Sequence, residues 1–266
     1  MRVQRSSLSF GWAVLAVASL VGCSRDPPPL RFDAAGNFQP ATLAEAVLFR
    51  NRTAVENFLA LGVDPNEPEP DGTTPLMRAV NGETLDIAQL LIDASADVNK
   101  ANYYGVTALY IAARDGDASA TRMLLAAGAN ANVALPAGET VLMTAAKAGN
   151  PEVVRALLTG GVEAVSLTEI GEARAAAGVA EAAGYSAQTN PALATNYADV
   201  NARERWYGRT ALMIAALEGH AAVVELLIEA GADPTLVDEE GSTALTLARS
   251  SGNLDVAAKL AALASR

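Results

Sequence analysis

The sequence predicts an all-α repeat solenoid, in which similar pairs of helices stack side by side into one elongated domain. The first observation is a phrase that recurs in steps of 33, 33, 70 and 33 residues. The same position of each copy is a threonine, namely Thr74, Thr107, Thr140, Thr210 and Thr243. The second observation is composition, since 51% of the residues are hydrophobic but only 5% are aromatic. Alanine and leucine supply most of the apolar volume, which favours close-packed helices over a β-sandwich.

Each copy of the phrase contains the signals that start and stop a pair of helices. A glycine precedes every threonine by two positions, at Gly72, Gly105, Gly138, Gly208 and Gly241. Threonine is a good N-cap residue, and proline, as at Pro75, suits the first helical position. Leucine pairs then indicate a second helix, at Leu90–Leu91, Leu124–Leu125, Leu157–Leu158 and Leu226–Leu227. A glycine after a helix supplies the left-handed stop.

A closing turn completes the unit, at residues 96–99, 128–132 and 231–234. With this turn, the unit resembles the ankyrin repeat, whose pattern is G-x-T-P-L-H-x-A-A, then L-L, then G-A-D-V-N. The resemblance covers about residues 41–266. It implies helix–turn–helix units joined by β-hairpin loops, which form a surface for binding other proteins.

Some residues depart from the family pattern. The slot of the family's histidine is filled by Met77, Tyr110, Met143 and Met213. Apolar packing replaces a hydrogen bond there, so we expect these four side chains in the core. His220 stands where the family often has Gly-His between helices, which indicates a structural role.

Two weaker units extend the count to about seven. Residues 41–66 fit the frame, and residues 167–203 are interpreted as a degenerate repeat with an insertion, because 70 residues is two periods plus four. Stacking stops at the two ends of a solenoid, where polar outer faces are expected. Asn57 and Lys259 occupy second-helix positions that are mostly apolar in the inner units.

The N-terminus has the layout of an export signal. Arg2 and Arg5 precede an apolar run from Phe10 to Val21, which is too short to span a bilayer. The run ends in Leu-Val-Gly before Cys23 and resembles the lipobox of bacterial lipoproteins. The resemblance implies removal of residues 1–22 and a lipid on Cys23. The alternative is an ordinary signal peptide that happens to contain a cysteine.

The segment after the cysteine predicts a tether. Residues 23–40 include three consecutive prolines at 27–29, which indicates a stiff, extended linker. Ser24 follows the cysteine, which in the resembling enterobacterial lipoproteins favours the outer membrane. We therefore expect a lipid-anchored protein of the bacterial cell envelope that faces the periplasm.

Charge and composition exclude several functions. The net charge is −11, and losing Arg2 and Arg5 with the signal would make it −13. An acidic surface is poorly suited to nucleic acid. One cysteine and one histidine leave little for metal binding or acid–base catalysis. We expect no enzyme activity, cofactor, metal site or small-molecule substrate.

In the resembling family, partners usually bind the hairpin tips and the inner, concave face of the first helices, and the candidate binding residues lie on the expected tips and on nearby first-helix ends. Two tips are doubly aromatic, and aromatic residues dominate binding hot spots. The predicted site consists of Tyr103, Tyr104, Arg114, Arg203, Arg205, Trp206, Tyr207 and Glu218. The alternative is that these rings pack against neighbouring hairpins or the insertion.

The leading hypothesis is a membrane-tethered module that binds a protein partner. A second is an immunity or inhibitor protein that masks a toxin or secreted enzyme, because an acidic groove would suit a basic effector. A third is an envelope stress or assembly factor that holds a client enzyme near the membrane. The sequence leaves these three open.

Overall fold

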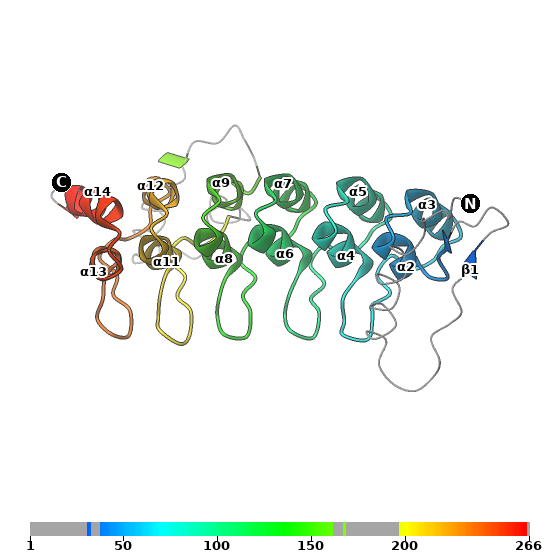
Figure 1. Cartoon of the computed structure of the whole chain (residues 1–266), viewed down its shortest axis with the longest axis horizontal. Helices are drawn as coiled ribbons and strands as arrows, with labels where there is room; N and C mark the ends of the chain where they lie inside the picture. The colour runs from blue at the N-terminus through cyan, green and yellow to red at the C-terminus, as the bar shows by residue number, and fades with distance from the viewer. Residues whose placement is uncertain (1–30, 33–37, 162–166, 169–196, 265–266) are drawn as a thin grey trace, which may run out of the picture.

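The computed structural model describes residues 31–32, 38–161, 167–168 and 197–264. Within them, helices lie in two parallel rows, and long loops project from one side of the stack (Figure 1). We name the six helix pairs units A to F in chain order. They are A, α2 (Leu43–Leu48) and α3 (Arg52–Ala60); B, α4 (Pro75–Asn81) and α5 (Leu85–Asp93); C, α6 (Ala108–Asp115) and α7 (Ala118–Ala126); D, α8 (Val141–Ala148) and α9 (Pro151–Leu158); E, α11 (Ala211–Glu218) and α12 (Ala221–Glu229); F, α13 (Ala244–Ser250) and α14 (Leu254–Ala264). The predicted all-helical solenoid is confirmed.

The threonines of the repeated phrase are the N-caps of the first helices. Thr74 accepts a hydrogen bond from the Met77 amide at 3.2 Å, and the threonines of the four later copies make the same bond. Left-handed glycines end three first helices, at Gly116, Gly149 and Gly219. These local bonds explain why the phrase recurs with a fixed spacing.

Unit B departs from this rule. Gly82 comes one position too early and has a φ of −87°, so Glu83 takes the left-handed conformation with a φ of 56°. A side chain there carries a strain of about 1–2 kcal/mol. The predicted glycine stop is therefore wrong for this unit. The position in the repeat, and not the presence of a glycine, decides which residue takes the left-handed conformation.

The core runs continuously through the stack. Met77, Met143 and Met213 are each about 1% exposed, which confirms their predicted burial. Tyr110 is partly buried against the same core. His220 is the residue before α12 and its side chain makes no capping bond to that helix; instead its Nε2–H donates to the Lys147 carbonyl at 3.1 Å. Its predicted structural role is confirmed, since it joins unit E to unit D.

The count of seven units is corrected by the packing between D and E. Helix α11 packs directly against α8, and α12 packs against α9 (Figure 1). The predicted fifth unit at 167–203 therefore does not form a layer between them. Residues 169–196 lie outside the described part of the chain. The sequence misled because 70 residues is close to two periods, whereas Thr140 and Thr210 begin the first helices of neighbouring layers.

A ladder of asparagines crosses every junction from unit B to unit F. Each side-chain oxygen accepts the backbone amide of the next closing turn. The bonds are Asn66 to Asp97, Asn99 to Asn130 and Asn132 to Asp199, all 2.7 Å, and Asn201 to Asp233, 2.9 Å. The ladder is uninterrupted at the junction that contains the insertion.

The two ends of the stack are polar at the predicted positions. Asn57 and Lys259 are both exposed, and Lys259 forms an ion pair with Glu225. Before unit A, β1 (Arg31–Phe32) pairs antiparallel with β2 (Phe38–Gln39). The chain therefore reverses direction within the segment expected to be an extended tether. In the part of the chain that is described, no helix is long and apolar enough to cross a membrane.

The predicted signal peptide, Cys23 and the prolines at 27–29 all lie outside the described residues. Their assignments stay predictions.

Candidate protein-binding surface

The loops that project from the stack are hairpins, and we call their ends tips B to F after the unit each one enters. They comprise residues 68–73 (tip B), 101–106 (tip C), 134–139 (tip D), 203–209 (tip E) and 237–242 (tip F). Tip C illustrates the shared geometry. The Asn102 amide donates to the Val106 carbonyl at 2.9 Å, and the Gly105 amide donates back to Asn102 at 3.0 Å. Gly105 has a φ of 79°, a conformation that glycine adopts without strain. The repeated glycine before each threonine is therefore required by the turn.

Backbone hydrogen bonds join most neighbouring tips. The Tyr103 amide donates to Asp71 at 3.2 Å, the Arg205 amide to Ala137 at 3.0 Å, and the Glu239 amide to Tyr207 at 2.8 Å. Tips C and D cannot make this bond, because the corresponding residue of tip D is Pro136, which has no N–H. The tips therefore form two linked groups, B with C and D with E and F.

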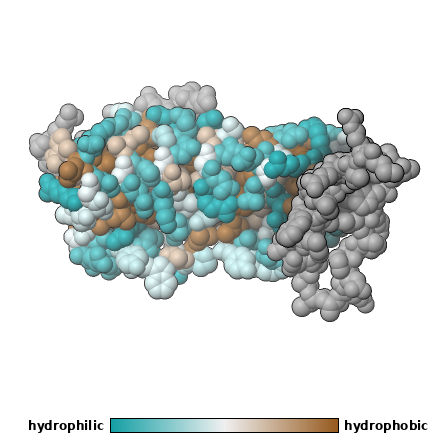
Figure 2. Space-filling model, in the orientation of Figure 1, coloured by the Kyte–Doolittle hydropathy of each residue, from teal (hydrophilic) through white to brown (hydrophobic). Residues whose placement is uncertain are grey.

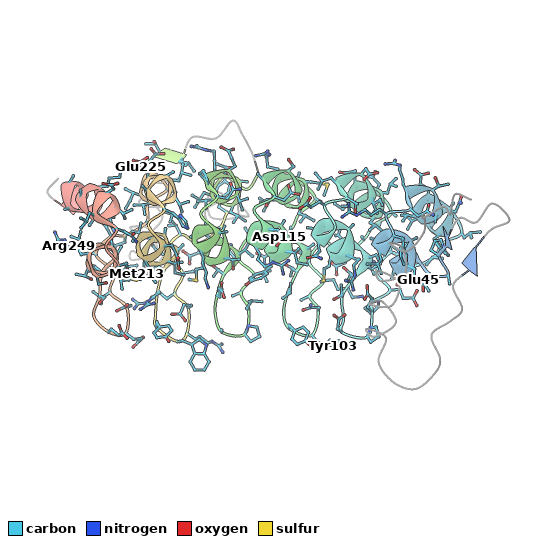
Figure 3. The ribbon with its side chains drawn as sticks, viewed as in Figure 1. Glu45, Tyr103, Asp115, Met213, Glu225 and Arg249 are labelled. Carbon is cyan, nitrogen blue, oxygen red and sulfur yellow. The ribbon has the colours of Figure 1, made fainter. Side chains whose placement is uncertain are left out.

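The predicted aromatic rings are on the surface. The exposed fractions are 77% for Tyr103, 68% for Tyr104, 74% for Trp206 and 52% for Tyr207. Tyr103 projects at the end of its hairpin, away from both helix rows (Figure 3). In Figure 2, the side chains that project along the lower edge of the molecule are coloured pale, which marks intermediate hydropathy. All four rings are therefore largely exposed to solvent, although the Tyr103 ring also lies beside the neighbouring hairpin, where a Cβ added at Gly72 would be 3.0 Å from its Cδ1.

Stacking brings the two aromatic tips near one another, although about 100 residues separate them in the chain. Among the described residues, only tip D lies between tips C and E, because units C, D and E are successive layers. Helices pack roughly 8–10 Å apart, so two layers correspond to roughly 16–20 Å. One protein partner can contact both tips at this separation, since a standard interface involves some 20–30 residues on each side.

Tip E has the most elaborate local structure. The Glu204 carboxylate accepts the amides of Trp206 and Tyr207, both at 2.6 Å, and that of Arg209 at 3.2 Å. Burial opposes the charge of this carboxylate, but the three amides and the nearby Arg209 outweigh burial and lower the pKa of Glu204. The carboxylate therefore stays ionised to lower pH than a free glutamate.

Arg209 supports the same tip from the stack side. Its guanidinium lies over the Tyr207 ring, 4.7 Å from the centroid, and its Nε is 3.3 Å from a carboxylate oxygen of Asp238. The Asp238 side chain is fully buried. Burial again opposes its charge, but bonds from the Ser242 amide, Arg209 and the Glu240 amide lower the pKa of Asp238. The Tyr207 ring is thus held by a cation–π contact with Arg209, whose guanidinium is itself paired with the buried Asp238 carboxylate.

Two descriptions of known repeats match this chain. The family model described as ankyrin repeats in three copies matches residues 43–134 and 179–265, and the model of the single ankyrin repeat matches residues 137–167. Together these ranges cover well over half of the chain.

The chain belongs to the ankyrin-repeat family.

A curated relative shows the same repeats in a much larger protein. Over 52 residues, or 20% of this chain, the sequence is 50% identical to Protein HOS4 of Saccharomyces cerevisiae. The match covers 5% of the yeast protein, so the ankyrin chain spans only a small part of that relative's length. Membership of the family is what the comparisons establish, and ankyrin repeats are in general non-catalytic scaffolds for protein–protein interaction.

The charged residues of the predicted site divide into two places. Arg203 and Arg205 are exposed on tip E, and Arg203 donates to the Val237 carbonyl of tip F. Arg114 and Glu218 are exposed in the last turns of α6 and α11. A helix of eight residues is about 12 Å long. Arg114 and Glu218 therefore lie one helix length away from the N-caps at which the hairpins join the first helices. The four aromatic residues of the predicted site lie on the tips and not at these helix ends.

Arg114 is also less available than the sequence indicated. Its guanidinium bonds Asp115 at 2.7 Å and Asn81 of the preceding unit at 3.0 Å. Sequence reasoning, conversely, missed the role of Glu204. The signal was present, because nine positions separate Asn201 from Thr210 but eight separate Asn99 from Thr107. In the described ankyrin units, no group of three or more His, Cys, Asp or Glu residues could hold a metal ion.

Proposed function

We propose that this ankyrin chain is a non-catalytic module that binds a protein partner through tips C to E. The observation that carries the proposal is the exposure of four aromatic side chains on two tips that the stack holds near one another. Exposed tryptophan and tyrosine are costly to leave in water and are enriched at binding hot spots. Arg203 and Arg205 supply polar contacts at the rim of tip E, and Arg114 and Glu218 extend the surface along the first helices.

The hydrogen bonds and contacts that hold the aromatic tips in place support this function. Binding sites on rigid elements lose less conformational entropy when a partner docks. Tip E is bonded to tips D and F through backbone amides, and Tyr207 is held by Arg209. The two aromatic tips therefore present a surface that is largely formed before the partner arrives.

We further propose that the module works at the bacterial cell envelope, anchored by a lipid on Cys23 and facing the periplasm from the outer membrane. The support is the Leu-Val-Gly-Cys sequence behind an apolar run. Two acyl chains are enough for stable anchoring, since each buried methylene contributes ~0.8 kcal/mol. The anchor would concentrate the tips at a membrane where the partner also resides.

Affinity recovery from envelope extracts tests the binding surface. Tagged wild type should retain a partner that Trp206→Ala combined with Tyr104→Ala loses. Leu254→Ala is the matched control, because Leu254 is 70% exposed on unit F, away from the aromatic tips. Recovery of the same partner with the double variant at wild-type yield would exclude the aromatic tips. The identity of the partner, a toxin, a secreted enzyme or a client enzyme, separates the narrower hypotheses.

Fractionation tests the anchor. Wild-type protein should sediment with membranes, whereas Cys23→Ala should be released by washing. Density separation of inner and outer membranes then locates the wild type. A Cys23→Ala protein that still fractionates fully with membranes would contradict the lipid anchor.

A further inference from the structure

Four tips use a side chain to hold their own backbone, since Asp71 of tip B accepts the Thr73 amide at 2.9 Å. Tips C and F share one geometry. In tip C, the Asn102 side-chain oxygen accepts the amides of Tyr104 and Val106, both at 3.0 Å. In tip F, Asp238 accepts the amides of Glu240 at 3.0 Å and Ser242 at 2.8 Å. In both cases the acceptor bonds the amides two and four positions later.

Tip E solves the same problem with a longer loop. Its closing bond runs from the Glu204 amide to the Arg209 carbonyl, five positions later, at 3.1 Å. In tips C and F the equivalent bond spans four positions, as from Asn102 to Val106. Glutamate has one methylene more than asparagine or aspartate, and its carboxylate reaches the amides two, three and five positions later. The longer side chain therefore matches the one additional residue of the loop.

We infer that Glu204 is a positioning residue that holds the Trp206–Tyr207 tip in one conformation for partner binding. This inference rests on the proposed function of the tip. Holding the backbone before contact lowers the entropy lost on binding, and charge-assisted bonds to backbone amides are the stronger kind.

The surroundings of Trp206 indicate that the Glu204 carboxylate, and not packing of the indole ring, holds this residue in place. The ring is 74% exposed, and the Trp206 amide donates to Glu204 at the apex of the tip. Its neighbours are anchored elsewhere, because the Arg205 amide bonds Ala137 and the Tyr207 carbonyl accepts from Glu239. Glu204 thus fixes the residue that the adjoining tips do not reach.

Hydrogen exchange at single amides in the full chain tests the inference. Glu204→Ala should speed exchange at the Trp206, Tyr207 and Arg209 amides on the order of tenfold or more, because each loses a bond to a charged acceptor. Exchange at the Tyr104 and Val106 amides of tip C should not change. Unchanged exchange at the three tip E amides would overturn the inference.

A length-matched pair of variants makes the test sharper. Glu204→Asp alone leaves the acceptor too short for the loop, so protection should be lost. Glu204→Asp with deletion of Arg205 recreates the Asp-x-x-Gly spacing of Asp238 to Gly241, so slow exchange should return at the Tyr207 and Arg209 amides, which then lie two and four positions after the aspartate. Protection that survives in the single variant, or does not return in the shortened one, would contradict the matched-length argument.

Partner recovery then links tip order to binding. A partner that Trp206→Ala loses should also be recovered several-fold less well with Glu204→Ala. Wild-type recovery with Glu204→Ala, despite fast exchange at the tip, would show that positioning has no consequence and would overturn the inference alone. Wild-type recovery with Trp206→Ala would instead remove the proposed function, while the exchange result still stood by itself.

Discussion

The junction between units C and D and the junction between units D and E differ in sequence but not in geometry. At the first, the Asn99 side chain accepts the Asn130 amide at 2.7 Å and donates to the Gly128 carbonyl at 3.0 Å. At the second, Asn132 accepts the Asp199 amide at 2.7 Å and donates to the Tyr197 carbonyl at 2.9 Å. The bonded residues are 31 positions apart in one case and 67 in the other.

The loop between units D and E accepts a long insertion at small cost in free energy. The Ala129 amide donates to Leu124, five positions earlier, whereas the Ala198 amide makes the equivalent bond to Leu157, 41 positions earlier. Loop closure costs about 0.6 kcal/mol for each doubling of length, so this insertion costs ~2 kcal/mol. Burying one leucine contributes about 1.5–3 kcal/mol, and the D–E junction buries several apolar side chains. Stacking therefore outweighs the longer loop.

The largest effect is expected from core truncation on either side of the comparison. Leu212 of α11 and Leu109 of α6 are each 1% exposed. Each Leu→Ala variant should lower the free energy of unfolding by about 2–5 kcal/mol, and the two should agree within about 1 kcal/mol. Urea denaturation measures both. A much smaller loss for Leu212→Ala, or separate melting of units E and F, would show that the D–E junction is loose.

The next effect distinguishes the helix stops at the two junctions. Gly116 and Gly149 both have a φ of 74°, so alanine costs about 1–2 kcal/mol of backbone strain at either one. A Cβ at Gly149 would also lie 2.5 Å from the His220 ring, whereas one at Gly116 would lie 3.2 Å from Asn150. Gly149→Ala should therefore destabilise by about 1 kcal/mol more, because the bond from His220 to Lys147 is lost.

Thermal unfolding of the two glycine variants gives this difference directly. A second change, His220→Asn, copies the Asn150 of the other junction and should remove most of the excess in Gly149→Ala. Equal destabilisation by the two single variants would mean that the histidine ring moves aside without cost.

A smaller effect is expected in the asparagine ladder. Asn132→Ala and Asn99→Ala each remove two hydrogen bonds at partly exposed positions, so each should cost about 1 kcal/mol. The losses of unfolding free energy in the two variants should be equal, and chemical denaturation of each variant measures them. A cost confined to Asn99→Ala would indicate that the insertion has already weakened the ladder at the other junction.

The smallest effect should come from the largest deletion. Removing residues 162–197 joins Gly161 to Ala198 and reproduces the Gly–Ala sequence at 128–129. The ~2 kcal/mol gained from loop closure offsets the lost burial of Leu167, which is 3% exposed, so the net change should be within about 1 kcal/mol.

Denaturation of the deletion variant, with tryptophan fluorescence as a reporter of tip E, checks this expectation. A variant that fails to fold would show that the inserted residues are required for the stack.

Local rules made much of the fold predictable. The threonine caps, the turn glycines and the buried methionines all follow from sequence positions within one unit, and all are confirmed. The unit count was not predictable, because a period counts residues and does not say which layers touch. Glu83 shows the same limit, since the repeat places the left-handed turn there and the neighbouring glycine at 82 does not take it.

Sequence by itself determined the period, the helix starts and the residues that face the core, because each depends on bonds between residues a few positions apart. Only tertiary structure decided that units D and E are neighbours and that four aromatic rings are largely exposed to solvent. Contacts between residues 31 to 67 positions apart depend on how whole layers pack. Whether a side chain is buried or exposed depends on which layers become neighbours in the stack.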